Sequence, residues 1–419
     1  MATTLESKGL DIAKIREDFP VLKRMAMNGR PVVYLDSTAT SQKPLPVVRA
    51  VEEYYTKYTA NVHRGIHMLS EEATMKYEES REKIARFINA KSPKEIVFVR
   101  GATEALNLVS YSMSHQLQRG DRVVTSLMEH HSNLVPWMML RDQKGVDLQF
   151  VDVTDDGYLK LDDLDAKITK GTKLVSMTHM SNVLGTVNPV KDIARLAHDR
   201  GALFCMDGAQ SVPHLKVDVQ EIDCDFLAVS GHKMLAPTGI GFLYAKEELL
   251  EKMEPFNYGG DMIKEVHVDR VRWNDVPYKF EAGTPNISGS IGLGAAVDYL
   301  NGLGMENIRQ HEIDITRLAL KRFEERPDVV LYGPKKAEHK GGVMAFNIGD
   351  AHGHDVASIL DAEGVCIRSG HHCAMPLMDK YGVNGTARAS FYVYNTDEEV
   401  DRLMEAVDKV REVFAPPAK

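Results

Sequence analysis

The stretch Leu203-Phe-Cys-Met-Asp207-Gly-Ala-Gln210 is a short apolar run that ends on a carboxylate and small residues. A second apolar run, Asp223-Cys-Asp-Phe-Leu-Ala-Val229, leads directly into Ser230-Gly-His-Lys233. Both runs are typical of β-strands. Active sites of open α/β sheets lie at the carboxyl ends of their strands, so we expect Asp207 and Lys233 to face one pocket.

An acid and a lysine in one pocket indicate a particular cofactor. Pyridoxal phosphate requires a lysine that can form an imine with its aldehyde and an acid that keeps its pyridine nitrogen protonated. The alternative is a surface loop with an ordinary solvated lysine, which is the commoner meaning of a single His-Lys pair. Residues elsewhere in the chain decide between a cofactor site and a surface loop.

Composition sets the broad class. The chain has 419 residues, of which 43% are hydrophobic and 26% charged, as in ordinary soluble globular proteins. The net charge of −9 argues against a nucleic-acid-binding face. No apolar run is long enough to cross a membrane, and residues 1–9 lack the pattern of a secretion signal, so we predict a cytoplasmic protein.

The four cysteines have no CxxC spacing, which gives no support to a zinc ribbon, a redox motif or any metal site. Cys205 and Cys224 lie inside apolar runs and are predicted core residues, and Cys366 lies in another strand-like segment. Cys373 differs, because Ser369-Gly-His-His-Cys-Ala-Met-Pro376 is polar and places two imidazoles beside the thiol.

Strands and helices alternate between about residues 95 and 230, which predicts an α/β fold with a doubly wound, largely parallel sheet. The predicted strands are 95–100, 121–125, 148–153, 173–177, 203–207 and 223–229. We expect a large cofactor-binding domain over residues 31–285. A smaller α+β domain is expected from residues 1–30 together with 286–419, and it should carry the Cys373 loop.

The turn after the first of these strands suits a phosphate. Gly101-Ala-Thr103 opens a predicted helix, whose first N–H groups and positive dipole end attract anions, and Thr103 adds a hydroxyl. The alternative is a plain capped helix.

Polar residues recur at the carboxyl ends of successive predicted strands, which suggests one shared site. They are Thr103, His130, Asn182, Asp207, Gln210, Ser230, His232 and Lys233. No GxGxxG follows the early strands and no Walker A sequence is present, which argues against a Rossmann dehydrogenase and a P-loop enzyme.

Further motifs over residues 16–413 carry a resemblance to a known family. They are Tyr34-Leu-Asp-Ser-Thr-Ala-Thr-Ser-Gln-Lys-Pro44, Asn61-Val-His-Arg-Gly65, Glu129-His-His-Ser-Asn-Leu-Val-Pro-Trp137, Ser230-Gly-His-Lys-Met234, Pro237-Thr-Gly-Ile-Gly241, Arg368-Ser-Gly-His-His-Cys-Ala-Met-Pro376 and Arg388-Ala-Ser-Phe391. The chain resembles pyridoxal-phosphate enzymes of fold type I, the aspartate-aminotransferase fold, in the class V aminotransferase branch. More closely, it is similar to group II cysteine desulfurases of the SufS type, which supply sulfur for iron–sulfur cluster assembly.

The resemblance implies roles around the cofactor ring. Lys233 would bond pyridoxal 5'-phosphate and then move the α-proton of the substrate, and Asp207 would keep the ring nitrogen protonated. Gln210 would donate to the phenolate oxygen and His130 would stack on the ring. Asn182 would lie near the substrate and the cofactor oxygen.

The resemblance also implies a phosphate site and a homodimer. The phosphate would be held by Ala102, Thr103, Ser230 and His232, and Thr284 would reach the phosphate of a neighbouring subunit.

On the substrate side, the resemblance implies that Arg388 pairs with the carboxylate of L-cysteine, a bidentate geometry that lysine cannot reproduce. Cys373 would attack the substrate sulfur as a thiolate, leaving a persulfide and alanine. His371, His372 and Arg368 could favour the ionised thiol, and Arg368 is also a predicted substrate-binding residue.

Few residues separate the strand before Arg368 from Cys373, so we expect a short, ordered loop that an acceptor protein must approach. The resemblance implies an acceptor of the SufU or SufE type and an iron–sulfur assembly scaffold. His354 either belongs to a solvated loop or helps to engage a zinc-bearing SufU-type acceptor.

Two alternatives to a cysteine desulfurase stay open. A selenocysteine lyase acting on L-selenocysteine would use the same scaffold, and a non-enzymatic partner in sulfur transfer would keep only the fold. Where the family has an aromatic–glycine pair after the lysine, this chain has Leu235-Ala236, which should shape that loop differently.

Overall fold

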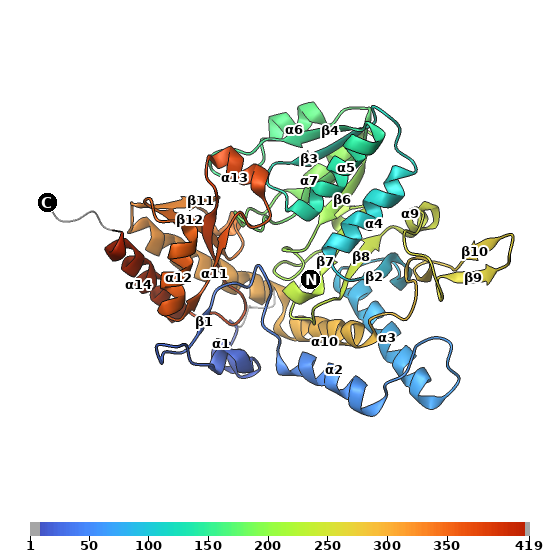
Figure 1. Cartoon of the computed structure of the whole chain (residues 1–419), viewed down its shortest axis with the longest axis horizontal. Helices are drawn as coiled ribbons and strands as arrows, with labels where there is room; N and C mark the ends of the chain where they lie inside the picture. The colour runs from blue at the N-terminus through green and yellow to red at the C-terminus, as the bar shows by residue number, and fades with distance from the viewer. Residues whose placement is uncertain (1–8, 415–419) are drawn as a thin grey trace, which may run out of the picture.

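The computed structural model describes residues 9–414, and a seven-stranded sheet lies at its centre (Figure 1). The strand order is β2-β8-β7-β6-β5-β3-β4. The bounds are β2 Ile96–Val99, β3 Arg122–Ser126, β4 Asp147–Val151, β5 Thr172–Thr178, β6 Leu203–Asp207, β7 Phe226–Ser230 and β8 Gly241–Ala245. All run parallel except β8, which is antiparallel to both of its neighbours, so the predicted largely parallel sheet is confirmed.

β8 has no counterpart among the predicted strands. Its apolar run Gly241–Ala245 follows β7 without a crossover helix, and a strand that returns after so short a connection has to pair antiparallel. The pairing places residues 231–240, the turn that includes Lys233, at the end of the sheet where the other polar residues gather.

Helices cover both faces of the sheet, which explains why its strands read as continuous apolar runs. One face packs on α4 (Ala102–Ser114) and α5 (Val135–Lys144). The other packs on α3 (Met68–Phe87), α7 (Val190–Asp199) and α10 (Ile287–Leu303). Further helices at the periphery are α1 (Ile12–Glu17), α2 (Leu45–Lys57), α6 (Leu161–Lys167), α8 (Val219–Ile222) and α9 (Glu247–Lys252).

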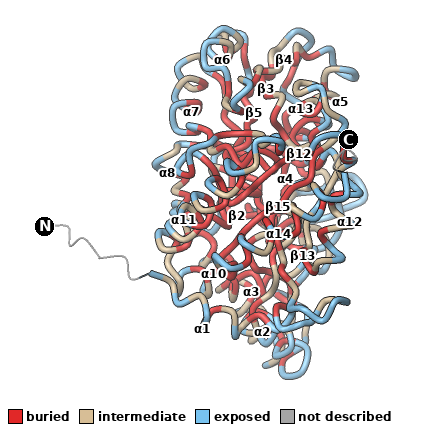
Figure 2. Tube along the Cα trace, turned by 90° about the vertical axis from the view of Figure 1, so that its left-hand side faces the viewer, coloured by how far each residue is buried: buried red, intermediate tan, exposed pale blue. Residues whose placement is uncertain are grey.

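A second, four-stranded sheet has the order β11-β12-β15-β14 and is antiparallel. Its strands are β11 Val329–Tyr332, β12 Val343–Ile348, β14 Arg368–Gly370 and β15 Thr386–Ser390. A separate group of buried residues joins it to α11 (Met305–Glu324), α12 (Gly353–Ala362) and α14 (Asp397–Val413), and α13 (Met375–Tyr381) follows β14. Figure 2 shows buried chain running through the centre of the molecule, with exposed segments around its rim.

The N-terminal strand belongs with this second sheet rather than with the first. β1 (Val33–Tyr34) pairs parallel with β13 (Val365–Cys366), and a bridge links Asp36 to Ser390 on β15. The division into domains at residues 31 and 285 stays a prediction, but this pairing ties residues 33–36 to the C-terminal part of the chain.

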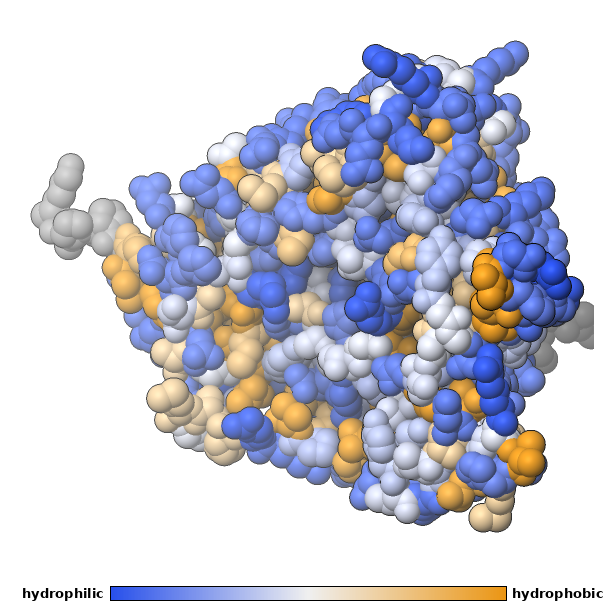
Figure 3. Space-filling model, turned by 45° about the vertical axis from the view of Figure 1, so that its right-hand side comes forward, coloured by the Kyte–Doolittle hydropathy of each residue, from blue (hydrophilic) through white to orange (hydrophobic). Residues whose placement is uncertain are grey.

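A hairpin of β9 (Ile263–Val266) and β10 (Val271–Trp273) projects from the large sheet (Figure 1). On the face shown in Figure 3, apolar side chains form several separate groups between hydrophilic ones. No helix among residues 9–414 is long and apolar enough to span a membrane. Cys205 and Cys224 are fully buried, which confirms them as core residues.

Candidate active site

One cavity of about 250 Å³ opens at the carboxyl ends of the parallel strands, beside β14 and β15 of the second sheet. It brings together almost all of the predicted site residues. They are Ala102, Thr103, His130, Asn182, Asp207, Gln210, Ser230, His232, Lys233, Arg368, Cys373 and Arg388. Thr284 is exposed and lines a different depression on the surface.

Asp207 and Lys233 have the electrostatics of a cofactor pair. Asp207 ends β6, and its Oδ1 accepts a hydrogen bond from the Ala209 N–H at 2.9 Å. Burial raises the pKa of the Asp207 carboxyl. Burial lowers the pKa of Lys233 to about 8, although the Asp207 charge opposes this shift. At pH 7 about one tenth of Lys233 is therefore the neutral amine that imine formation requires, far more than for an ordinary lysine.

His130 and Gln210 are both held in fixed orientations. His130 Nδ1 accepts a hydrogen bond from the Ser132 N–H at 3.0 Å, so Nε2 carries the proton of the neutral ring. Burial and the nearby Lys233 lower the pKa of His130 to about 3. A neutral imidazole can stack on a protonated pyridine ring without charge repulsion. Gln210 Nε2 donates to the Thr38 carbonyl at 2.8 Å and has a second N–H for another acceptor.

The start of α4 provides the features of a phosphate site. Ser230 Oγ accepts from the Ala102 N–H at 2.9 Å, and Thr103 Oγ1 lies 2.7 Å from Ser132 Oγ, so hydroxyls gather at this helix N-terminus. β8 can approach closely only because it begins with glycine. A Cβ on Gly241 would lie 2.8 Å from the Gly101 Cα.

Arg388 is almost completely buried on β15, with 3% of its surface exposed. Its Nη1 donates to the Asn182 carbonyl at 2.9 Å, and its Nη2 lies 3.4 Å from Asp36 Oδ1. Burial lowers its pKa to about 10, and Asp36 opposes the shift, so the guanidinium stays charged. Arg368 is exposed and pairs with the same Asp36 carboxylate at 3.0 Å.

The Cys373 turn is tied down on both sides. The Cys373 carbonyl accepts from the His131 N–H at 2.6 Å, and the Cys373 N–H donates to His371 Nδ1 at 3.0 Å. The Met375 N–H donates to His131 Nε2 at 3.0 Å. Asn182 Nδ2 donates to the His372 carbonyl at 2.8 Å. Cys373 itself is exposed.

The predicted help of His372 in ionising Cys373 is wrong. The His372 ring is buried, and its Nε2 lies 3.0 Å from both the carbonyl and the Oγ1 of Thr386. Burial lowers its pKa to about 3, so the ring is neutral and brings no positive charge to the thiolate. The cations that line the cavity with Cys373 are Lys233, Arg368 and Arg388.

Residues 36–43, which we call the N-terminal strap, contribute to the site although none of them is a predicted site residue. The carbonyl oxygen of His232 accepts from Ser41 N, Ser41 Oγ and Thr40 Oγ1, each at 3.1 Å, and from Lys43 Nζ at 2.8 Å. The peptide group before Lys233 is therefore fixed by the strap. The dense run of hydroxyls after Asp36 was the available signal.

Comparison with known proteins gives the family. The model of the family described as aminotransferase class V matches residues 33–403. The chain belongs to this family. A protein of Halalkalibacterium halodurans named as a probable cysteine desulfurase is 51% identical over 402 residues, covering 96% of this chain and 98% of that protein.

Solved structures agree with this assignment. The apo structure of a cysteine desulfurase from Thermococcus onnurineus has a TM-score of 0.91 at 44% identity, covering 99% of this chain and 100% of that chain. The cysteine desulfurase CsdA of Escherichia coli, in an S-sulfonic acid form, has a TM-score of 0.89 at 38% identity, covering 96% and 99%. The predicted family and fold class are confirmed.

The residues present fit pyridoxal 5'-phosphate. The buried Asp207 faces the cavity with a carboxyl oxygen to which no described residue donates, as a protonated ring nitrogen requires. The neutral His130 provides a surface for the ring, and the hydroxyls of Ser230 and Thr103 at the start of α4 suit the phosphate. Among residues 9–414, no cluster of three or more histidine, cysteine or acidic side chains could hold a metal ion.

Proposed function

We propose that the chain is a pyridoxal-phosphate-dependent cysteine desulfurase, which converts L-cysteine to L-alanine and leaves a persulfide on Cys373. The observation that carries this proposal is that one cavity holds an amine of lowered pKa, a buried arginine and an accessible thiol: Lys233, Arg388 and Cys373. Relatives that are 51% and 47% identical to this chain over nearly its whole length are named as cysteine desulfurases, which supports the same activity.

Each side chain of the site has a separate role in the proposed reaction. Bound pyridoxal phosphate supplies an electron-withdrawing ring, which makes the α-proton of an attached amino acid acidic. Arg388 binds the substrate carboxylate and so sets the direction in which the α-proton and the sulfur point. Lys233, as the neutral amine, takes the α-proton and returns a proton to carbon. Asp207 stabilises the positive charge on the ring nitrogen.

Sulfur transfer balances without an external oxidant. The thiolate of Cys373 forms a bond to the substrate sulfur while the carbon–sulfur bond of the substrate breaks. The electron pair of that bond stays with the carbon fragment, which takes up protons and leaves as L-alanine. L-cysteine and one enzyme thiol thus become L-alanine and one persulfide.

Mass spectrometry of the protein after treatment with L-cysteine tests the proposal. We expect one added sulfur atom on Cys373. Cys373→Ala should abolish alanine release but keep slow exchange of the substrate α-proton. Cys366→Ala is the matched control, since Cys366 lies outside the cavity, and it should form the persulfide normally. Alanine release by Cys373→Ala would overturn the assignment.

The alternative of a selenocysteine lyase is not favoured, because the relatives are named for cysteine. Comparing turnover of L-cysteine and L-selenocysteine decides between the two. A non-enzymatic partner is also not supported, since Lys233, Asp207, Cys373 and Arg388 are all present and share one cavity.

We also propose that an acceptor protein of the SufU or SufE type takes the persulfide sulfur toward an iron–sulfur assembly scaffold in the cytoplasm. The Cys373 turn is short and held by hydrogen bonds, which supports an acceptor protein that binds at the site itself. The exposed His354 contacts the strand that leads into this turn, with Nδ1 3.0 Å from Ser369 Oγ on β14. His354→Ala should lower acceptor-stimulated turnover and leave the basal rate, whereas the exposed control His339→Ala should change neither. Equal loss of basal and stimulated rates in His354→Ala would argue against this role.

A homodimer is the remaining part of the proposal. Thr284 is exposed and does not line the cavity of its own chain, which agrees with a role at the phosphate of a neighbouring subunit. Light scattering should give the mass of two chains, and Thr284→Ala should weaken cofactor retention. A stable, active monomer would contradict it.

A further inference from the structure

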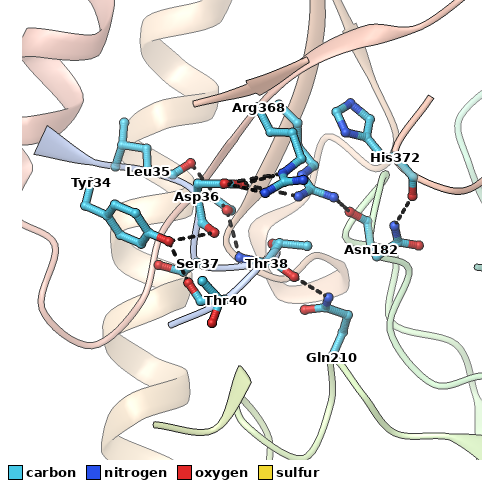
Figure 4. Close-up of polar contacts among 12 residues, drawn as sticks. Tyr34, Leu35, Asp36, Ser37, Thr38, Thr40, Asn182, Gln210, Arg368 and His372 are labelled. Carbon is cyan, nitrogen blue, oxygen red and sulfur yellow. Dashed lines mark hydrogen bonds and ion pairs between the residues drawn. The ribbon is translucent and has the colours of Figure 1, made fainter. Parts of the chain in front are cut away.

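The Asp36 carboxylate pairs with two arginines that line the cavity, Arg368 and Arg388. Figure 4 shows its contact with Arg368. Arg368 places Nε 3.2 Å from Oδ1 and Nη2 3.0 Å from Oδ2. Arg388 places Nη2 3.4 Å from Oδ1. Asp36 does not line the cavity, whereas both arginines do, so Asp36 can act on a bound substrate only through them.

The backbone forces these two arginines together. Arg368 on β14 and Arg388 on β15 are directly opposite in the antiparallel register. Like charges in such a pair repel each other, and the buried position of Arg388 strengthens the repulsion. The single carboxylate of Asp36 compensates one of the two positive charges, so the three groups together carry one net positive charge.

The free N–H donors of Arg388 also suit a single substrate carboxylate. Of its five N–H groups, one on Nη1 points to the Asn182 carbonyl and one on Nη2 to Asp36. Its Nε is buried and has no partner among the described residues. One N–H on each terminal nitrogen remains, which is enough for a bidentate bond to one carboxylate.

We propose that Asp36 is a specificity-determining residue that restricts the substrate site to amino acids with a single carboxylate. This inference rests on the proposed role of Arg388 in binding the substrate. The α-carboxylate of L-cysteine neutralises the one net positive charge. A second carboxylate in a substrate side chain would lose its hydration and find the neighbouring Arg368 already paired with Asp36.

The test compares a ligand with one carboxylate and a ligand with two. Dissociation constants of L-alanine and L-aspartate are measured by calorimetry on the cofactor-loaded enzyme. Asp36→Asn removes the negative charge and leaves Arg368 free, so the preference for L-alanine over L-aspartate should fall about tenfold. A folding defect would weaken the binding of both ligands and would not lower the preference for L-alanine over L-aspartate.

A second variant should move the preference in the opposite direction. Arg368→Gln leaves Asp36 to act on Arg388 alone, so the preference for L-alanine over L-aspartate should rise. Asp401→Asn and Arg322→Gln are matched controls. They break an exposed arginine–aspartate pair of 2.8 Å on α14 and α11, and they should leave the ratio within about twofold of the parent.

The inference is overturned if Asp36→Asn leaves the ratio unchanged or shifts both ligands equally. If Asp36→Asn does not fold, an unchanged or reduced preference in Arg368→Gln overturns it. Failure of the proposed function looks different, because the parent enzyme would then not convert L-cysteine to alanine at all.

Discussion

The imidazole of His131 holds the Cys373 turn in place, and removing its ring nitrogens should slow persulfide formation selectively. His131→Phe keeps a ring of similar size but deletes the acceptor for the Met375 N–H, which lies 3.0 Å from Nε2. The second contact, from the His131 backbone N–H to the Cys373 carbonyl at 2.6 Å, survives the substitution. The variant therefore loses one hydrogen bond at one end of the turn.

The magnitude follows from the backbone of the turn. His372 and Cys373 both have positive φ, at 51° and 56°. Each non-glycine residue in this region costs about 1–2 kcal/mol, so the turn carries a strain of roughly 3 kcal/mol. Its hydrogen bonds contribute about 0.5–1.5 kcal/mol each. Losing one of about 1 kcal/mol lowers the equilibrium constant for the turn in position about fivefold. Where strain and bonds are close to balance, the fraction of turns in position then falls about threefold.

Two rates measured on one protein separate this effect from general damage. Rapid-quench mass spectrometry with L-cysteine should show persulfide formation on Cys373 slowed about threefold. Exchange of the α-proton of L-alanine in deuterated water should be unchanged, because Lys233 and Asp207 are untouched. His115→Phe, which replaces an exposed histidine, is the control. Equal loss of both rates, or an unchanged rate of persulfide formation, would refute the role of the His131 ring.

The decline of persulfide formation at low pH offers an independent check on the role of the His131 ring. Burial and the neighbouring His371 lower the pKa of His131, so its ring stays neutral to a pH below its usual range. Protonation turns Nε2 into a donor and breaks the bond from the Met375 N–H. In the parent, persulfide formation should decline in acid as His131 takes up a proton, and His131→Phe should lack this step.

Three further predictions concern Lys233, Arg81 and Glu129. Cofactor loading of the apoenzyme should speed up with pH, with a midpoint near pH 8, because burial lowers the pKa of Lys233 to about 8. The rate should level off above about pH 9 in absorbance stopped-flow, and a rise that is still steep at about pH 10 would contradict this. Arg81→Leu should lower the free energy of unfolding in urea by about 3–5 kcal/mol, because it leaves the Glu281 carboxylate buried without its partner at 2.7 Å. The control Arg86→Leu, on the surface, should lower the free energy of unfolding far less. Burial raises the pKa of Glu129 to about 8, so the folded state holds a proton that the unfolded state has lost above about pH 4. Stability should therefore fall as pH rises from about 4 to 8, and Glu129→Gln should flatten this fall in unfolding curves.

The large sheet could be predicted because its signals are local. Each strand is a short apolar run, and residues such as Thr103, Asp207 and Lys233 follow directly after a run. The rule that parallel strands expose their carboxyl ends at one edge then placed these residues in one cavity. No knowledge of long-range contacts was needed for that step.

The contacts of Cys373 illustrate what local signals leave out. Two histidines precede the thiol, and the sequence gives no reason to treat them differently. In the fold, His371 is exposed and accepts the Cys373 N–H, whereas His372 turns inward to Thr386 and stays neutral. Burial decides between them, and burial depends on β15, which comes later in the chain.

The run of hydroxyls in the N-terminal strap is visible in the sequence, but the partners of the strap could not be predicted for a similar reason. Its partners are far away in the chain: His232 lies 192 positions beyond Thr40, and Arg388 lies 352 positions beyond Asp36. The same short segment fixes the peptide group before Lys233 at one end and the guanidinium of Arg388 at the other. The strap therefore holds both the backbone beside the amine that we propose moves the α-proton and the cation that we propose binds the carboxylate. A substitution that shifts the strap displaces both groups together, so its effect on turnover should exceed that of an equal shift at either group alone.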